Sequence, residues 1–190
     1  MIISLSGLPG SGKSFIAEKL AHKLGWPRYY MGGLRRKMAE EKGLTLAEYN
    51  KLGETDPSTD LEVDTYQRKL GQTEDNFVIE GRTSWYFIPK SLKIFLSIDP
   101  RVGSERIFKE LQEENNRNED AGLHTIEDVI ESNAKRMASD NRRYQKYFNI
   151  DAFDENNFDY VLDTSNLSKD EVFEKVLAYV EKTLGEKLKV

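Results

Sequence analysis

A chain of 190 residues is long enough for one domain with a hydrophobic core and short for two. Hydrophobic residues make up 38% and charged residues 32%, which predicts a highly charged surface over a modest core, while the apolar periodicity along most of the chain excludes disorder. The net charge of −5 argues against a general nucleic-acid binder, and the absence of cysteine excludes disulfides, thiolate metal sites and cysteine nucleophiles.

No apolar run approaches the ~20 residues that span a bilayer. The apolar start of the chain, MIISLS, is too short for a signal peptide. We therefore expect a cytoplasmic protein that binds neither membrane nor nucleic acid, and we expect it to be a monomer.

The first strand, loop and helix carry the strongest motif. Residues 1–6 predict a buried strand, and apolar residues at helical spacing then predict a helix that Gly25 ends. Between them, GLPGSGKS fits the phosphate-binding pattern G-x-x-x-x-G-K-[ST]. Its glycines let backbone N–H groups surround an anion, the Lys13 amine can reach the β- and γ-phosphates, and the Ser14 hydroxyl can bind Mg²⁺. An ordinary tight turn between strand and helix is the weaker alternative. The predicted triphosphate-binding residues are Gly7, Leu8, Pro9, Gly10, Ser11, Gly12, Lys13, Ser14 and Phe15.

A second short strand is predicted over residues 26–31, ended by the glycine pair 32–33, and a helix follows as far as about Gly43. The first turn of this helix carries Arg35, Arg36 and Lys37. Three cations are unfavourable at the positive end of a helix dipole, and a bound anion would offset that cost. An anion site and a solvated basic turn are equally supported at this point.

Two further helices are predicted before the next strand. Thr45 and Glu48 form a capping box for a short helix, and Asp56 with Pro57 starts a helix over residues 58–70. The acidic residues of this segment are expected mostly on a solvated face. Because its apolar content is too sparse for a separate domain, we predict that residues 33–72 are a helical insertion between strands.

Two charged residues follow the next strand. Residues 76–82 form a buried strand that ends in Glu80, Gly81 and Arg82. In doubly wound sheets, ligands sit beyond the carboxyl ends of the strands, so both side chains are expected near the phosphates. We predict that Glu80 holds Mg²⁺ or its water shell and that Arg82 binds a phosphate; a local ion pair is the alternative, but two charges after a buried strand are costly without partners.

A fourth strand is predicted over residues 92–98, and Asp99 with Pro100 starts the helix that follows. This helix runs into a polar stretch, residues 110–120, that has no apolar stripe. The simplest interpretation of this stretch is an exposed, mobile segment. The alternative is that it belongs to a lid over approximately residues 105–135.

Thr125 and Asp128 start a long helix that extends to about Phe148. Its expected buried stripe is Ile126, Ile130, Met137 and Tyr144. A second face carries Arg136, Asp140 and Arg143. From spacing alone, a surface ion pair between Arg136 and Asp140 is better supported than a functional role.

The last strand is predicted over residues 158–163, and Ser168 with Glu171 caps the final helix. Strands that alternate with helices predict an α/β fold with a parallel sheet and right-handed crossovers. We therefore expect a single domain, residues 1–190, with a five-stranded parallel sheet between two helical layers.

One triphosphate loop and several arginines placed to converge near it indicate a small-molecule kinase. Arginine suits bidentate phosphate contacts and the charge on a transferring phosphoryl group. Phosphoryl transfer needs positioning and electrostatic stabilisation, and a lid would exclude water.

Beyond the loop, several segments resemble the cytidylate kinases, in their compact archaeal-type form, within the P-loop nucleoside monophosphate kinases. The resemblance runs over most of residues 1–165 and rests on the segments GGLRRKMA, ETDP with Asp60 and Asp64, VIEGR, Arg136-x3-Asp140-x2-Arg143-Tyr144, YFNID and YVLDTS. The loop occurs in many families, whereas the combination is far more specific.

The resemblance implies an ATP-dependent, Mg²⁺-requiring kinase of CMP or dCMP, with residues 33–72 binding the acceptor nucleotide. Arg36 and Arg82 would hold the acceptor phosphate. Lys13, Arg136 and Arg143 would be the catalytic residues. Arg136 and Arg143 would contact the acceptor or the transferring phosphate. Asp140 would bind the acceptor sugar, and Asp64 would also contact the acceptor. The resemblance thus favours a functional role for the pair of Arg136 and Asp140.

Two other functions stay open from the sequence. One is another P-loop small-molecule kinase, acting on a different nucleotide, shikimate or a sugar acid. The other is a non-catalytic nucleotide-binding switch module, which the second set of arginines argues against.

Overall fold

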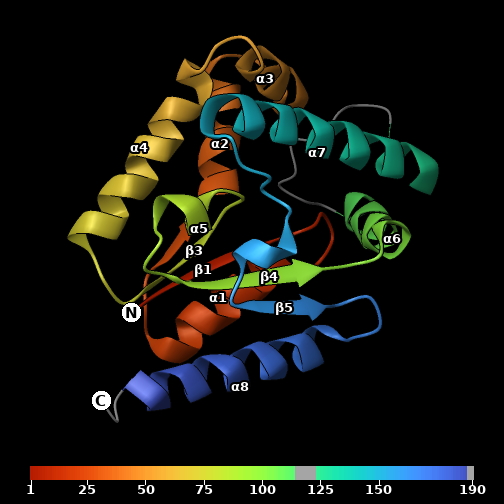
Figure 1. Cartoon of the computed structure of the whole chain (residues 1–190). Coiled ribbons are helices and arrows are strands. Elements are labelled where there is room, and N and C mark those ends of the chain that lie inside the picture. Colours follow the sequence, from red (N-terminus) through yellow and green to blue (C-terminus); the bar gives the residue numbers. More distant parts are fainter. Residues whose placement is uncertain (114–122, 188–190) are drawn as a thin grey trace.

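The computed structural model describes residues 1–113 and 123–187. At its centre is a five-stranded sheet in the order β2-β3-β1-β4-β5, with every neighbouring pair parallel (Figure 1). The strands are β1 (Ile2–Gly7), β2 (Arg28–Tyr30), β3 (Phe77–Glu80), β4 (Leu92–Ser97) and β5 (Tyr160–Asp163). The predicted five-stranded parallel α/β fold is confirmed.

The helices are α1 (Lys13–Leu24), α2 (Met31–Glu41), α3 (Leu46–Gly53), α4 (Ser58–Thr73), α5 (Ser84–Phe87), α6 (Pro100–Leu111), α7 (Ile126–Phe148) and α8 (Lys169–Lys187). A short 3-10 helix, Glu155–Asn157, precedes β5. Among these described helices, none has the length and apolar character that crossing a membrane requires.

The two faces of the sheet bury different side chains because residues alternate along a strand. Ile3 and Leu5 of β1 join the core formed with α1 and α8, whereas Ile2 joins a second core with residues of α2, α3 and α4. Figure 1 shows α1 and α8 on one side of the sheet and α2, α4 and α7 on the other. The predicted three layers are therefore present.

The predicted capping boxes at Thr45 and Thr125 are both formed, with Glu48 and Asp128 respectively. Asp99 accepts hydrogen bonds from the first backbone N–H groups of α6, as its position before Pro100 predicts. Asp56 accepts from the Ser58 N–H at 2.9 Å, although Pro57 is the residue that directly precedes α4.

The start of α2 differs from the prediction. The helix begins at Met31, so the glycine pair lies inside its first turn and Arg35, Arg36 and Lys37 fall in the second turn. The Tyr30 ring packs against the glycines, where an added Cβ at Gly33 would lie 2.6 Å from the ring. The helix-dipole argument for an anion at these cations is therefore wrong, because the dipole acts mainly within the first turn.

The burial of two helices also differs from the prediction. On α4, Asp60 and Asp64 are buried instead of solvated. On α7, Val129 and Tyr144 are buried, while the rest of the predicted apolar stripe is half-buried. Ser139, Asp140 and Arg143 of α7 are buried as well, and Arg143 forms an ion pair with Asp60 of α4. Part of the predicted lid, residues 114–122, lies outside the described residues.

Candidate active site

The phosphate-binding loop connects β1 to α1 and packs against two other elements. Gly7 and Gly10 adopt positive φ values of 147° and 79°. A Cβ added at Gly7 would lie 2.2 Å from the Leu96 carbonyl oxygen of β4, and one at Gly10 would lie 2.2 Å from that of Gly103 on α6. Glycine is therefore required at both positions, by conformation and by close approach.

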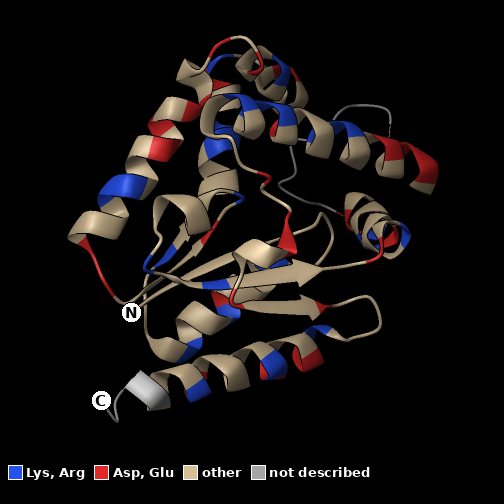
Figure 2. Ribbon diagram, viewed as in Figure 1, with Lys and Arg blue, Asp and Glu red and all other residues tan. Residues whose placement is uncertain are grey.

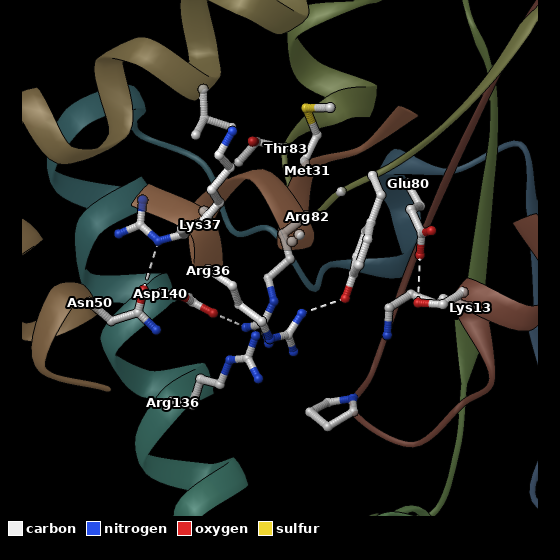
Figure 3. A pocket seen from close by; sticks show the side chains of 18 of the residues that line it. Lys13, Met31, Arg36, Lys37, Asn50, Glu80, Arg82, Thr83, Arg136 and Asp140 are labelled. Atoms are coloured by element: carbon white, nitrogen blue, oxygen red, sulfur yellow. Dashed lines mark hydrogen bonds and ion pairs between the residues drawn. The ribbon is translucent and has the colours of Figure 1, made fainter. Parts of the chain in front are cut away.

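The loop opens into a cavity of about 690 Å³. Pro9, Gly10, Lys13 and Ser14 line one part of it, and the Lys13 amine is held over the loop by a 2.7 Å hydrogen bond to the Leu8 carbonyl. The other walls include residues of α2, α4, α6 and α7 and of the segment after β3, several of which Figure 3 shows. One cavity thus joins the triphosphate loop to the predicted acceptor residues.

The predicted metal-binding pair is brought together. The Ser14 hydroxyl donates to Glu80 Oε2 at 2.8 Å, and the Glu80 carboxylate is buried at the end of β3. Its other oxygen accepts from Arg28 Nε at 2.8 Å. Sequence reasoning placed residue 28 in a strand and missed this role, because the contact joins neighbouring strands β2 and β3 that are distant in the chain.

Arginine side chains gather in the middle of the cavity. Figure 3 shows Arg36, Arg82 and Arg136 with their guanidinium groups close together, coming from α2, the segment after β3 and α7. Burial, together with Arg136 and Arg143, lowers the pKa of Arg82 to about 9. Such a concentration of positive charge favours a bound anion.

Asp140 binds two of the predicted arginines. It accepts from Arg82 and, at 2.8 Å, from Arg143 Nη2. Asp140 is 3% exposed, so the surface ion pair with Arg136 that spacing favoured is not what the structure shows. The Asp140 carboxylate instead holds Arg82 in place at the cavity.

Arg143 does not line the cavity. Its side chain is fully buried, and its Nε donates to Asp60 Oδ2 at 3.0 Å. Asp60 also accepts from Arg35 Nη1 at 2.6 Å. The contact with the acceptor or transferring phosphate that the resemblance implied for Arg143 does not fit this position, because both neighbouring carboxylates already hold the guanidinium behind the cavity wall.

Sequence reasoning also missed Asp60, whose acidic neighbours suggested a solvated helix face. Asp64, one turn further along α4, lines the cavity. Burial and the nearby Asp60 raise the pKa of Asp64 to about 7.

Phe15 is 37% exposed, outside the cavity lining, and its ring lies beneath the amines of Lys19 and Lys169.

Comparison with known proteins decides the family. The model of the cytidylate kinase-like family matches residues 2–166. The chain belongs to this family. A cytidylate kinase of Methanocella arvoryzae is 39% identical over 165 residues, covering 87% of this chain and 88% of the relative. That of Pyrococcus furiosus is 35% identical over 182 residues, covering 95% of this chain and 88% of the relative.

Solved structures of other kinases share the fold of this chain. Shikimate kinase from Bacteroides thetaiotaomicron superposes with a TM-score of 0.62 at 15% identity, covering 97% of this chain and 98% of that one. A gluconokinase from Sinorhizobium meliloti gives 0.58 at 16% identity, covering 98% and 94%. At these identities the likeness concerns the fold alone.

Proposed function

We propose that this chain is an ATP-dependent kinase that transfers the γ-phosphate of ATP to CMP or dCMP, giving ADP and CDP or dCDP. The observation that carries the proposal is the cluster of Arg36, Arg82 and Arg136 in the same cavity as the phosphate-binding loop. A second anion beside the triphosphate is what a phosphate acceptor supplies, and the curated relatives are named cytidylate kinases. In the reaction, an acceptor phosphate oxygen bonds to the γ-phosphorus while the bond from that phosphorus to ADP breaks.

At the donor end, the residues of the loop bind the triphosphate. The backbone N–H groups around Gly10 and Gly12 surround the phosphates, and the amine of Lys13 neutralises charge on the β- and γ-phosphates. The Lys13 amine is already poised there by the Leu8 carbonyl. These fixed donors need no reorganisation as charge moves during transfer.

The oxygen atoms of Ser14 and Glu80 fit a magnesium ion, which would polarise the phosphate oxygens. They come from one hydroxyl and one carboxylate that lie 2.8 Å apart beside Lys13. Mg²⁺ prefers oxygen ligands and keeps several waters, so one direct hydroxyl and a carboxylate near its water shell are sufficient protein ligands. The hydrogen bond from Arg28 Nε orients the Glu80 carboxylate for this role.

At the acceptor end, Arg36, Arg82 and Arg136 hold the phosphate of CMP or dCMP. Each guanidinium can donate two parallel hydrogen bonds to a phosphate. Asp140 holds Arg82 and lines the cavity, and in this proposal it accepts hydrogen bonds from the acceptor sugar. In this proposal residues 33–72 bind the acceptor and approximately 105–135 form the lid of a single domain.

The proposal predicts that ATP and CMP give ADP and CDP in equal amounts when the products are separated by ion-exchange chromatography. ADP without CDP would instead indicate hydrolysis by a nucleotide-binding switch module. The arginine cluster argues against that alternative, because a switch needs no second phosphate site. The likeness to shikimate kinase and gluconokinase is a likeness of fold. It does not favour shikimate or a sugar acid as the acceptor of this chain.

A further inference from the structure

Tyr30 ends β2 at the point where the two parts of the cavity meet. In the parallel pairing of β2 with β3, it lies opposite Glu80, the carboxylate that accepts from Ser14 of the phosphate-binding loop. Its side chain lines the cavity, and its hydroxyl contacts Arg36 of the arginine cluster. Tyr30 therefore links the end of the sheet beside the loop to the arginine cluster.

Close packing restricts the position of the Tyr30 ring. A Cβ added at Gly32 would lie 2.8 Å from its Cε2 atom, and one at Gly33 would lie 2.6 Å from its Cδ1 atom, so the ring lies directly against α2. The guanidinium carbon of Arg28 lies 5.4 Å from the ring centroid, a distance at which a cation is attracted to an aromatic ring. The hydroxyl at the far end of the ring is therefore held in a defined place.

This hydroxyl accepts a hydrogen bond from Arg36 Nη1. The guanidinium carbon of Arg36 also lies 5.9 Å from the centroid of the same ring. Arginine is a long side chain that loses much conformational entropy when it is fixed. A rigid partner reduces the part of this cost that falls on ligand binding, because the guanidinium is already oriented when the ligand arrives. The Tyr30 side chain thus has the geometry of a support for Arg36.

The charge of the supporting group differs between two arginines of the cluster. Arg82 is held by the carboxylate of Asp140, whose negative charge offsets part of the positive charge. The Tyr30 hydroxyl is an uncharged acceptor, so its hydrogen bond orients Arg36 without offsetting the charge of the guanidinium. A tyrosine at this position therefore orients the cation and leaves its attraction for a phosphate undiminished.

We propose that Tyr30 is a positioning residue, whose hydroxyl holds the Arg36 guanidinium in the orientation that binds the acceptor phosphate. The inference rests on the proposed function, in which Arg36 binds the phosphate of CMP or dCMP. Tyr30 acts through Arg36 and is not itself a ligand of the phosphate. Loss of the hydroxyl therefore weakens acceptor binding and leaves the triphosphate site, which is built on the loop, intact.

The test is Tyr30→Phe, which keeps the ring against the glycines and removes only the hydroxyl. We expect the KM for CMP to rise about 5- to 20-fold, as the loss of a hydrogen bond to a charged group predicts. The KM for ATP should stay within about twofold. Tyr29→Phe is the matched control and should leave both KM values unchanged. It removes the hydrogen bond of the neighbouring hydroxyl to Glu74, and Tyr29 does not line the cavity.

A double-mutant cycle with Arg36→Ala separates positioning from a general disturbance of the cavity. If the hydroxyl acts through the guanidinium, Tyr30→Phe should change the KM for CMP by less than about twofold once residue 36 is alanine. Multiplication of the two single effects in the double variant would overturn the inference. An unchanged KM for CMP in Tyr30→Phe, or equal increases in the KM for CMP and for ATP, would overturn it as well.

Failure of the proposed function looks different, since the wild-type enzyme would then not phosphorylate CMP at all. NMR of the Arg36 Nε–H group, assigned by its absence from Arg36→Ala, provides a second measurement that needs no turnover. Nitrogen relaxation should show a rigid group in the wild type and in Tyr29→Phe, and a more mobile one in Tyr30→Phe. An Arg36 group that is equally rigid in all three proteins would contradict the positioning role of Tyr30.

Discussion

At the scale of single residues, Arg36 tests whether the arginine cluster binds the acceptor. Its guanidinium lines the cavity on the α2 side and donates to the Tyr30 hydroxyl. We expect Arg36→Ala to raise the KM for CMP about 10- to 100-fold, as the loss of a charge-assisted phosphate contact predicts. The KM for ATP should stay within about threefold, because the loop holds ATP by other groups.

The matched control for this variant is Lys42→Ala, which removes an exposed cation at the end of the same helix. Steady-state kinetics with each substrate varied in turn makes the comparison. Equal increases in the two KM values would contradict the assignment of Arg36 to the acceptor.

Arg143 and Arg142 provide a contrast between a buried and an exposed ion pair on one helix. Arg143 is fully buried between Asp60 and Asp140, whereas the side chain of Arg142 is 59% exposed beside Glu54. Removing one partner of a buried pair leaves an uncompensated charge, so Arg143→Met should lower the free energy of unfolding by about 3 kcal/mol. Arg142→Met should change it little, because water screens the exposed pair.

Urea denaturation of both variants measures these free energies. Similar losses in the two would show that the buried network does not stabilise the wall of the cavity. An Arg143 variant that folds as stably as the wild type but loses phosphoryl transfer would instead support the direct phosphate contact that the family resemblance implied for Arg143.

At the scale of elements, the contact between α6 and the phosphate-binding loop is a feature that no sequence motif marks. A Cβ added at Gly103 would lie 2.6 Å from the Pro9 carbonyl oxygen and 3.2 Å from Ile98 Cγ2. Gly103→Ala should therefore displace the loop and lower kcat/KM for ATP on the order of 10- to 100-fold.

Gly185→Ala on α8 is the matched substitution, because nothing lies within 4 Å of the added Cβ. It should leave activity unchanged and raise the free energy of unfolding by about 0.5–1 kcal/mol, the helix preference of alanine over glycine. Equal kinetics in the two variants would show that the loop tolerates the approach of α6.

Local signals predicted most elements, because strands, caps and apolar stripes depend on neighbouring residues. The capping boxes at Thr45 and Thr125 and the end of α1 at Gly25 are examples. What could not be predicted depends on contacts between distant elements. The start of α2 at Met31 depends on how the Tyr30 ring packs over the glycines, and the burial of Asp60 depends on Arg143, 83 residues away.

At the scale of the whole molecule, three arginines of a net negative chain meet in one cavity beside the phosphate-binding loop. Figure 2 shows both signs of charge along α7 and α8, whereas the arginines of the cavity converge from three parts of the chain. The parallel sheet makes this possible by placing the loop after β1 and Arg82 after β3 at the same edge. Arg36, Arg82 and Arg136 lie in the cavity as the sequence predicted, whereas Arg143, which was also expected there, is buried behind its wall.

The stability of the whole chain should depend on pH through Asp64. Its pKa is raised from 3.8 to about 7 in the fold, so the unfolded chain releases this proton at lower pH than the native protein does. The contribution of Asp64 to stability is therefore present at pH 4 and is lost as the pH rises to about 7. Asp64→Asn removes this loss.

The free energy of unfolding of Asp64→Asn minus that of the wild type should thus be larger at pH 8 than at pH 5, which means that the variant gains relative stability as the pH rises. Urea denaturation at the two pH values measures the difference, in which the other titrating groups cancel. A difference that does not change with pH would contradict the perturbed ionisation of Asp64.

The most direct test of a two-substrate kinase site is phosphoryl transfer from ATP, with Mg²⁺, to CMP, dCMP, UMP, AMP, GMP, shikimate and gluconate. Lys13→Ala sets the background, because it removes the amine that lies over the loop. We predict that CMP or dCMP gives the highest kcat/KM in this panel and that Lys13→Ala lowers it by several orders of magnitude. Turnover of CMP and dCMP no higher than that of Lys13→Ala would contradict the account.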